Sequence, residues 1–156
     1  MTVMDTDPTP VHHRIEVALT VEQAFDLFVH GMARWWPFAS HSCGGADARD
    51  VVVQPYLGGT VTEHTRSGTT HPWGRITAWE PPALFAMTWH PAQAPERATQ
   101  LSVRFRATEG GCAIDLHHGG WAARGADAIE MRDNYQRGWA MVLGRYAAAA
   151  AEGVHP

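Results

Sequence analysis

Three side chains in this sequence could carry out acid–base chemistry if they met inside an apolar interior. They are His41 in a glycine-rich stretch, Glu63 in the run GTVTEHT, and His118 at the end of the run CAIDLHH. A buried carboxylate without a partner is costly, whereas a Glu–His pair in apolar surroundings has shifted pKa values and can transfer a proton. Two kinds of partner for Glu63 therefore stay open: a histidine, His41 or His118, or Arg75 at a sheet edge.

His118 allows two interpretations. Cys112, Ile114, Leu116 and His118 alternate along one face of a strand-like run, which places the imidazole among apolar side chains. It could orient a ligand or act as a general base, or it could be a buried histidine bonded to a neighbour. His117 points to the opposite face and is expected at the surface.

The other chemistry-bearing residues form no recognisable site. The sequence has ten histidines, but the adjacent pairs His12-His13 and His117-His118 can each offer only one ligand to a given site. No CxxC or HxxxH spacing typical of structural zinc occurs. No GxSxG nucleophile elbow, Walker or GxGxxG pattern is present either. We therefore expect no metal, no cofactor and no assigned catalytic residue, with Cys112 in the core and Cys43 in an exposed loop.

Aromatic residues give the strongest indication of a binding site, since seven of the 156 residues are tryptophan. They could fill an ordinary core, or they could line a cavity that holds a small apolar molecule. We expect a cavity lined by the following residues: Trp35, Trp36, His41, Glu63, Trp73, Phe85, Met87, Trp89, Phe105, His118, Trp121, Tyr135 and Trp139.

Trp35 and Trp36 lie in the stretch MARWWPFASHS, in one short helical turn that Pro37 ends. Neighbours on a helix diverge by about 100°. One indole is therefore expected to face the interior while the other packs under the loop that follows. That glycine-rich loop, residues 40–50, could open and close the cavity mouth.

The elements that must position these residues follow from hydrophobic periodicity. Alternation predicts a first strand over 13–20, and Thr20 with Gln23 forms a capping box for a helix over 20–31. Short alternating runs separated by Gly and Pro turns then predict six antiparallel strands. They cover residues 50–55, 59–65, 73–80, 84–90, 100–107 and 112–118.

A long helix is predicted over 127–152. Met131, Tyr135, Trp139, Val142 and Tyr146 form one continuous apolar stripe along it. Gly138 lies inside this helix at a cost of about 1 kcal/mol relative to alanine. A glycine there indicates that another group approaches the helix closely.

Composition and charge narrow the class of protein. The length fits one domain, which we place at residues 11–151, with tails at 1–10 and 152–156. A net charge of −4 and a pI near 6.2 argue against nucleic acid as a partner. The acidic, proline-rich N-terminus and the lack of a long apolar run predict no membrane insertion. We expect a cytoplasmic protein, and a homodimer stays open.

These elements predict an α+β fold. A curved antiparallel sheet of about six or seven strands would wrap around the long C-terminal helix, with two short helices after the first strand. A sheet that wraps a helix in this way does not fill its own interior as a flat sandwich does. It can therefore leave a cavity between the sheet and the helix.

Over residues 12–150, an ordered set of short motifs carries a resemblance to a known group. The motifs are RWWP…HS, QPYLGGTVTE, WGRITAWEPPALF, TWH, DLHHGGW and RDNYQRGWAMVLGRYA. In this order they resemble the START-like superfamily (SRPBCC, the helix-grip fold), in the branch named after the activator of heat-shock-protein-90 ATPase. The resemblance implies the wrapped fold and a cavity, and it implies a histidine at the position of His118 and an acidic residue at that of Glu63.

Three functions follow as expectations. The first is a binding module for a small hydrophobic or aromatic molecule held between the sheet and residues 127–151. The second is an enzyme of the cyclase or hydrolase kind that uses His118 or Glu63 for proton transfer. The third, suggested only by the family name, is a co-chaperone-like interaction module.

Overall fold

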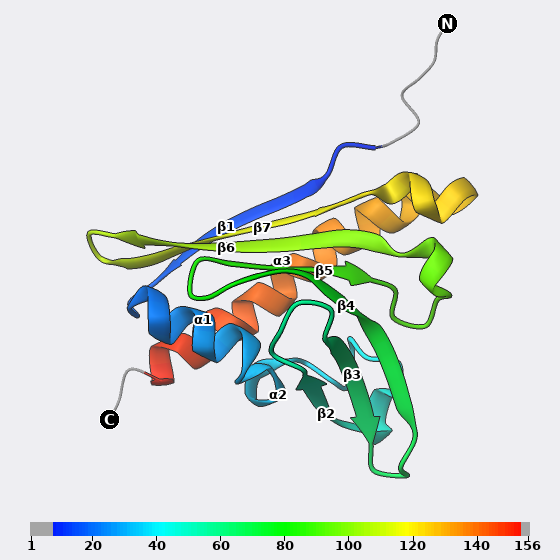
Figure 1. Cartoon of the computed structure of the whole chain (residues 1–156), viewed down its shortest axis with the longest axis horizontal. Helices are drawn as coiled ribbons and strands as arrows, with labels where there is room; N and C mark the ends of the chain where they lie inside the picture. Colours follow the sequence, from blue (N-terminus) through cyan, green and yellow to red (C-terminus); the bar gives the residue numbers. More distant parts are fainter. Residues whose placement is uncertain (1–7, 154–156) are drawn as a thin grey trace, which may run out of the picture.

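Seven antiparallel strands form one curled sheet in the order β1-β7-β6-β5-β4-β3-β2 (Figure 1). The computed structural model describes residues 8–153. The strands are β1 (Val11–Val17), β2 (Ala48–Val53), β3 (Thr60–Thr65), β4 (Thr70–Glu80), β5 (Leu84–Trp89), β6 (Thr99–Thr108) and β7 (Gly111–Gly119). The predicted antiparallel meander is confirmed, and β1 closes onto β7 at one edge.

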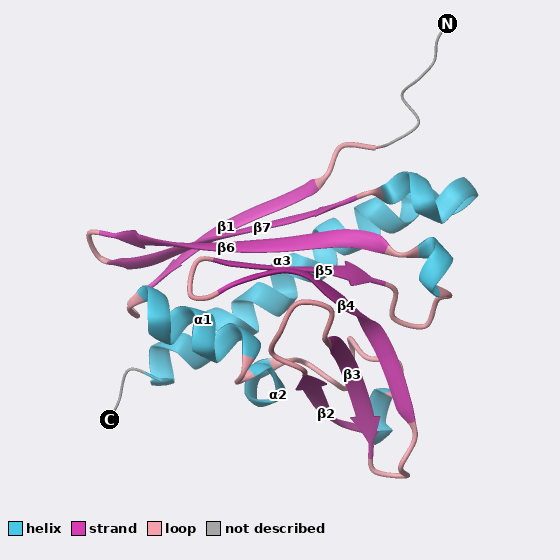
Figure 2. Ribbon diagram, viewed as in Figure 1, coloured by secondary structure: helices cyan, strands magenta, loops and turns pink. Residues whose placement is uncertain are grey.

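Two short helices follow β1, and one long helix crosses a face of the sheet (Figure 2). They are α1 (Val21–Val29), α2 (Met32–Trp35) and α3 (Ala128–Gly153). Three 3-10 turns complete the structure: η1 (Gly45–Asp47), η2 (Pro95–Arg97) and η3 (Trp121–Asp127). This arrangement is the predicted α+β helix-grip fold.

The start of α1 is fixed by the predicted capping box. The Thr20 hydroxyl accepts the backbone N–H of Gln23, and the Gln23 side chain accepts the backbone N–H of Thr20. Because Thr20 caps the helix, β1 ends earlier than the predicted residue 20, at Val17. The apolar side of α1 then packs into the core through Phe25 and Phe28.

Irregularities in the strand pairing bend β2, β3 and β4 away from the rest of the sheet, as Figure 2 shows. Register shifts occur between Val61 and Thr62 on β3 and between Ile76 and Ala78 on β4. Such bulges increase local twist. At Gly74 the strands approach so closely that a Cβ atom would lie 1.8 Å from the carbonyl oxygen of Thr88, so only glycine fits there. The resulting curl separates the β2–β4 end from α3 and leaves space between them.

The other end of the interior is filled. Tyr146 of α3 is fully buried, and its hydroxyl donates to the carbonyl of Ala24 in α1 at 2.8 Å. Phe28 of α1 contacts the rings of Trp35, Phe105 and Tyr146. This interlocked aromatic packing ties α1, α2, β6 and α3 together.

Most of each predicted tail, 1–10 and 152–156, lies outside the residues that the structure describes. Residues 1–7 and 154–156 lie outside the described part of the chain. Within the predicted N-terminal tail, the carbonyl of Thr9 accepts the Nε–H of Arg132 at 2.9 Å. The predicted C-terminal tail begins inside α3, which continues to Gly153. Among residues 8–153 no helix is long and apolar enough to cross a membrane.

Candidate ligand-binding site

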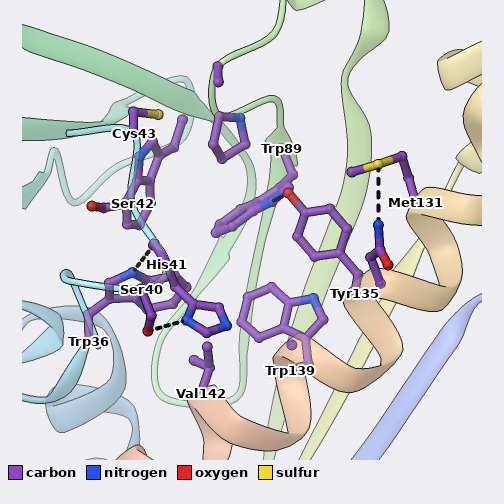
Figure 3. A pocket seen from close by; sticks show the side chains of 15 residues that line it. Trp36, Ser40, His41, Ser42, Cys43, Trp89, Met131, Tyr135, Trp139 and Val142 are labelled. Carbon is purple, nitrogen blue, oxygen red and sulfur yellow. Dashed lines mark hydrogen bonds between the residues drawn. The ribbon is translucent and has the colours of Figure 1, made fainter. Parts of the chain in front are cut away.

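A pocket of about 310 Å³ opens between α3, the loop after α2 and the loop that follows β5 (Figure 3). Its walls are mostly apolar. The residues that line it are Trp36, Ser40, His41, Ser42, Cys43, Trp73, Trp89, Pro91, Ala92, Met131, Asn134, Tyr135, Gly138, Trp139 and Val142.

Four tryptophans from four different elements dominate these walls. Trp36 is the C-cap of α2, Trp73 lies on β4, Trp89 ends β5 and Trp139 comes from α3. The ring centroid of Trp36 lies 4.9 Å from that of Trp73, 6.0 Å from that of Trp89 and 5.8 Å from that of Trp139. All four side chains are at least nine-tenths buried. Their mutual contacts form one continuous wall without filling the pocket.

Each indole N–H in this wall already has an acceptor within the protein. The four hydrogen bonds are Trp36 to the His41 carbonyl at 2.6 Å, Trp73 to Glu63 Oε1 at 2.9 Å, Trp89 to the Tyr135 hydroxyl at 3.1 Å, and Trp139 to His118 Nδ1 at 2.9 Å. With their polar edges engaged, the indoles offer carbon surface to the pocket.

Glu63 anchors the loop that forms one side of the pocket. Its fully buried carboxylate accepts the backbone N–H of Cys43 at 2.9 Å, that of Gly44 at 2.7 Å and the Trp73 indole N–H. A Cβ atom at Gly44 would lie 2.8 Å from Thr65 and 3.1 Å from the carboxylate, so glycine permits this close approach. Glu63 thus positions the loop and Trp73 together.

The structure corrects the expected partners of Glu63. Neither His41 nor His118 bonds to it, and Arg75 instead donates to the carbonyl of Gly58 at 3.1 Å. Backbone N–H groups replace the expected cation because the loop after α2 folds back over the carboxylate. Glu63 lies behind the pocket wall and does not line the pocket.

Cys43 lines the pocket and is half-buried, rather than exposed as expected. Burial, together with the nearby Glu63 charge, raises the pKa of its thiol to about 11. The thiol therefore stays protonated at neutral pH and is a poor nucleophile.

His118 is the fully buried centre of a directed hydrogen-bond chain. Its Nδ1 faces the Trp139 indole, which can only donate, so Nδ1 is the acceptor and the proton lies on Nε2. Nε2 donates to the Thr99 hydroxyl at 2.6 Å, which in turn donates to the carbonyl of Trp89 at 3.1 Å. If the proton were on Nδ1, that N–H would face the indole N–H of Trp139, and two donors cannot form a hydrogen bond with each other.

This environment keeps the imidazole neutral. Burial, with a smaller contribution from the Arg124 charge, lowers the pKa of His118 to about 3. Both ring nitrogens are engaged, and His118 lies behind Trp139 without lining the pocket. Of the two interpretations left open by the sequence, the structure has the buried histidine bonded to its neighbours. Its geometry supports the wall, and it is not placed to exchange protons with a pocket ligand.

Two polar side chains that do face the pocket are those of Tyr135 and His41. The hydroxyl of Tyr135 accepts the Trp89 indole N–H, and Figure 3 shows the two groups meeting at the pocket edge. His41 pairs through Nδ1 with the Ser40 hydroxyl at 2.7 Å. A Cβ atom at Gly138 would lie 3.7 Å from His41 Nε2, so His41 is the group that approaches α3 at this glycine.

Seven of the predicted cavity residues lie outside the pocket. Besides Glu63 and His118, they are Trp35, Phe85, Met87, Phe105 and Trp121, all of which belong to the packed core. Their strand and helix faces do point inward as predicted. However, each of these side chains is buried in the core cluster and none of them lines the pocket.

Trp35 and Trp36 do diverge. Trp36 faces the pocket, while Trp35 donates its indole N–H to the carbonyl of Leu27 at 2.9 Å and contacts Tyr146. Trp35 therefore packs against α1 and α3 rather than under the loop, where the sequence places it. Both indoles are buried.

Sequence reasoning missed nine lining residues: Ser40, Ser42, Cys43, Pro91, Ala92, Met131, Asn134, Gly138 and Val142. Met131 and Val142 belong to the predicted stripe of the long helix, and Gly138 interrupts that helix, so these positions carry a usable signal. Ala92 has a positive φ of 62°, which no sequence pattern indicates. Among residues 8–153 no cluster of three or more His, Cys, Asp or Glu side chains could hold a metal ion.

Solved structures similar to this chain share its fold. A protein from Rhodobacter sphaeroides is 19% identical with a TM-score of 0.69, covering 92% of this chain and 93% of that one. The Aha1 dimer from Colwellia psychrerythraea is 18% identical with a TM-score of 0.66, covering 92% and 96%. The anthrahydroquino-gamma-pyrone synthase Txn09, solved as a complex, is 28% identical with a TM-score of 0.63, covering 93% and 99%.

No curated protein matches the chain. A family model does match, over residues 18–151, and its description is Activator of Hsp90 ATPase homolog 1-like protein. This range contains the seven-stranded sheet except β1, and nearly all of α3. The chain therefore belongs to the Activator of Hsp90 ATPase homolog 1-like family, within the START-like (SRPBCC) superfamily.

Proposed function

We propose that this domain binds a small, planar, mostly apolar molecule in the aromatic pocket. The observation that carries the proposal is the wall of four tryptophans whose N–H groups are all bonded inside the protein. Covering the carbon surface of such a wall with an apolar ligand removes that surface from water, which favours binding. A volume of about 310 Å³ lies at the lower end of the range of ligand pockets, about 300–1,000 Å³.

Fluorene, a rigid planar hydrocarbon, is a suitable probe. We expect it to quench tryptophan fluorescence saturably, with one molecule bound per chain, and to raise the melting temperature. Stabilisation should follow ligand saturation, at about 2.7 kcal/mol for a hundredfold excess over the dissociation constant. Absence of saturable binding by fluorene and by similar planar aromatics would contradict the proposal.

A matched pair of glycine variants locates the binding. Gly138 lines the pocket on α3, whereas Gly144 lies on the exposed side of the same helix, where an added Cβ atom would meet nothing within 4 Å. Gly138→Leu should block fluorene binding because its side chain projects into the pocket. Gly144→Leu should bind fluorene as the parent protein does. Equal binding by both variants would place the probe elsewhere.

A second candidate is a cyclase-type enzyme, favoured by the 28% identity to the synthase over 93% of this chain. His118 and Glu63 were the expected proton-transfer groups, but both are bonded within the protein and lie behind the wall. His41 is the histidine that lines the pocket, so it is the group to test.

The test uses 1-(2-hydroxyphenyl)butane-1,3-dione, which closes to a gamma-pyrone ring with loss of one water. The phenol oxygen attacks the distal ketone carbon, and that carbonyl oxygen leaves as water. Acceleration by the parent protein and its loss in His41→Ala, with fluorene binding retained, would support the enzyme. A rate equal to that in buffer would remove this candidate for this class of substrate.

The remaining expectations stay predictions. The co-chaperone hypothesis rests on the family description, and the dimer is a property of the Colwellia relative. Stimulation of an Hsp90 ATPase and the sedimentation behaviour of the protein test these two predictions separately. A cytoplasmic location is tested by fractionation of the source cells.

A further inference from the structure

The indole N–H groups of the pocket wall are all used within the protein. The four indole N–H groups have acceptors, as described above. The Tyr135 hydroxyl receives the Trp89 N–H, but among residues 8–153 its own hydrogen has no acceptor. Tyr135 is partly buried and lines the pocket. A strong donor is therefore left unused at an apolar surface.

The position of this hydroxyl is fixed by its neighbours. Trp89 donates to its oxygen, and the carbonyl of Trp89 accepts from Thr99. On another side, the ring of His118 lies 4.9 Å from the Tyr135 ring, and that of Trp121 lies 5.4 Å from it. Because the oxygen already accepts one hydrogen bond, its O–H is polarised and becomes a better donor.

The hydroxyl keeps its proton. Burial is the main cause that raises the pKa of Tyr135 above its ordinary value. At neutral pH the group is therefore an O–H donor and not a phenolate. An apolar ligand that covers this donor without pairing it would carry a cost, whereas a ligand that supplies an acceptor avoids that cost.

The charges around the pocket select the kind of acceptor. No Arg or Lys side chain is among the described residues that line it. Behind the Trp73 side of the wall lies the fully buried carboxylate of Glu63, which three N–H groups surround. An anionic ligand would lose its hydration without gaining an Arg or Lys partner. A neutral acceptor on an aromatic ring system fits these surroundings better.

We infer that the pocket selects neutral aromatic ketones, with the ligand carbonyl oxygen accepting a hydrogen bond from the Tyr135 hydroxyl. This inference rests on the proposed binding function and names its ligand class. Tyr135 determines specificity in this account, while the tryptophan wall supplies the bulk of the apolar contact. Trp89 acts through Tyr135 as a positioning residue.

Three probes of matched shape test the inference: fluorene, 9-fluorenone and fluorene-9-carboxylate. They share the fluorene ring system and differ only in the group at one carbon. We expect fluorenone to bind about fivefold to tenfold more tightly than fluorene, as one neutral hydrogen bond allows. The carboxylate should bind more weakly than fluorene.

Tyr135→Phe should abolish the preference for fluorenone, so that this variant binds fluorenone and fluorene equally, whatever its affinity for fluorene. Tyr146→Phe is the matched control, because that hydroxyl donates to the Ala24 carbonyl outside the pocket. If Tyr135→Phe does not fold, infrared spectra of the parent protein replace it. The carbonyl stretch of bound fluorenone should then lie at lower frequency than in an apolar solvent.

The outcomes separate this inference from the proposed function. If no probe binds, the binding function itself fails. If fluorene and fluorenone bind equally, or if the bound carbonyl stretch is unshifted, the pocket exists but Tyr135 does not select ketones. Tighter binding of the carboxylate would also overturn the inference, because the pocket would then select an anion and not a neutral ketone.

Discussion

At the scale of single residues, burial and hydrogen-bond partners decide which polar side chains meet the ligand. His118 and Glu63 stand out in the sequence as acid–base candidates, yet both are saturated inside the protein. His118 holds Trp139, and Glu63 holds Trp73 together with the loop over residues 43–44. Their effect on the pocket is indirect, through the indoles that they position.

His118 makes stability depend on pH. Its pKa falls from 6.5 in an unfolded chain to about 3 in the native protein, so the unfolded chain binds more protons between these values. The stabilisation is fully present above pH 6.5 and is lost progressively as the pH falls towards 3. Within that window the loss is about 1.4 kcal/mol per pH unit.

Urea denaturation of the parent protein and His118→Gln at pH 7.5 and pH 5 measures this contribution. We expect the variant to be less stable at pH 7.5, by about 1–3 kcal/mol, because the Trp139 and Thr99 groups lose good partners. The difference should shrink at pH 5, since glutamine does not titrate. A difference that is equal at both pH values would show that His118 is not buried in the neutral form.

Glu63→Gln should destabilise the protein by about 1.5–3 kcal/mol. The carboxylate accepts three N–H groups, and an amide would point its own N–H at one of these donors. Urea denaturation gives the size of the loss, and faster amide exchange at Cys43 and Gly44 would locate it. Arg75→Ala is the control, with little effect expected because Arg75 bonds to the exposed Gly58 carbonyl. A large loss of stability in Arg75→Ala with little effect of Glu63→Gln would contradict these hydrogen bonds. It would instead favour the Glu63–Arg75 pair that the sequence left open.

At the scale of elements, α3 both supports the core and forms one wall of the pocket. Gly138 and Gly144 lie within this helix. A glycine inside a helix costs about 1 kcal/mol relative to alanine. An added Cβ at Gly138 would be in ordinary contact with His41 at 3.7 Å, and one at Gly144 would meet nothing within 4 Å.

Gly138→Ala and Gly144→Ala should therefore each stabilise the protein by about 0.5–1 kcal/mol. Thermal and urea denaturation measure both changes, which should add because the two sites share no contact. Gly138→Ala should also weaken ligand binding slightly, whereas Gly144→Ala should not. Destabilisation by Gly138→Ala would mean that His41 approaches the helix more closely than the structure shows.

Periodicity predicted these elements well and their irregularities poorly. Alternation in CAIDLHH and the stripe from Met131 to Tyr146 set the strand and helix faces within a few residues. The shifts in strand register at Val61 and Ile76 leave no pattern in the sequence, because a bulge depends on how the partner strand pairs. The loop at residues 40–45 could not be predicted either, since its path depends on Glu63 about twenty residues away.

At the scale of the whole molecule, the curled sheet has a filled end and an open end. Side-chain periodicity predicted that Phe85, Phe105 and Trp89 face inward, and they do so. It could not predict how far α1 covers that inner face. Phe105 packs against Phe25 and Phe28 of α1, whereas Trp89 extends past that cover into the pocket. The pocket therefore takes in only the predicted residues that lie beyond this cover, and loop residues complete its lining.

The most direct test of a tryptophan-walled binding site uses the indole N–H signals of the protein in solution. Seven tryptophans give seven separate reporters, of which Trp36, Trp73, Trp89 and Trp139 line the pocket. On titration with fluorene, ring currents should shift these four signals in NMR spectra and leave those of Trp35, Trp79 and Trp121 nearly unchanged. Shifts confined to the latter three, or no shift at all, would contradict the account.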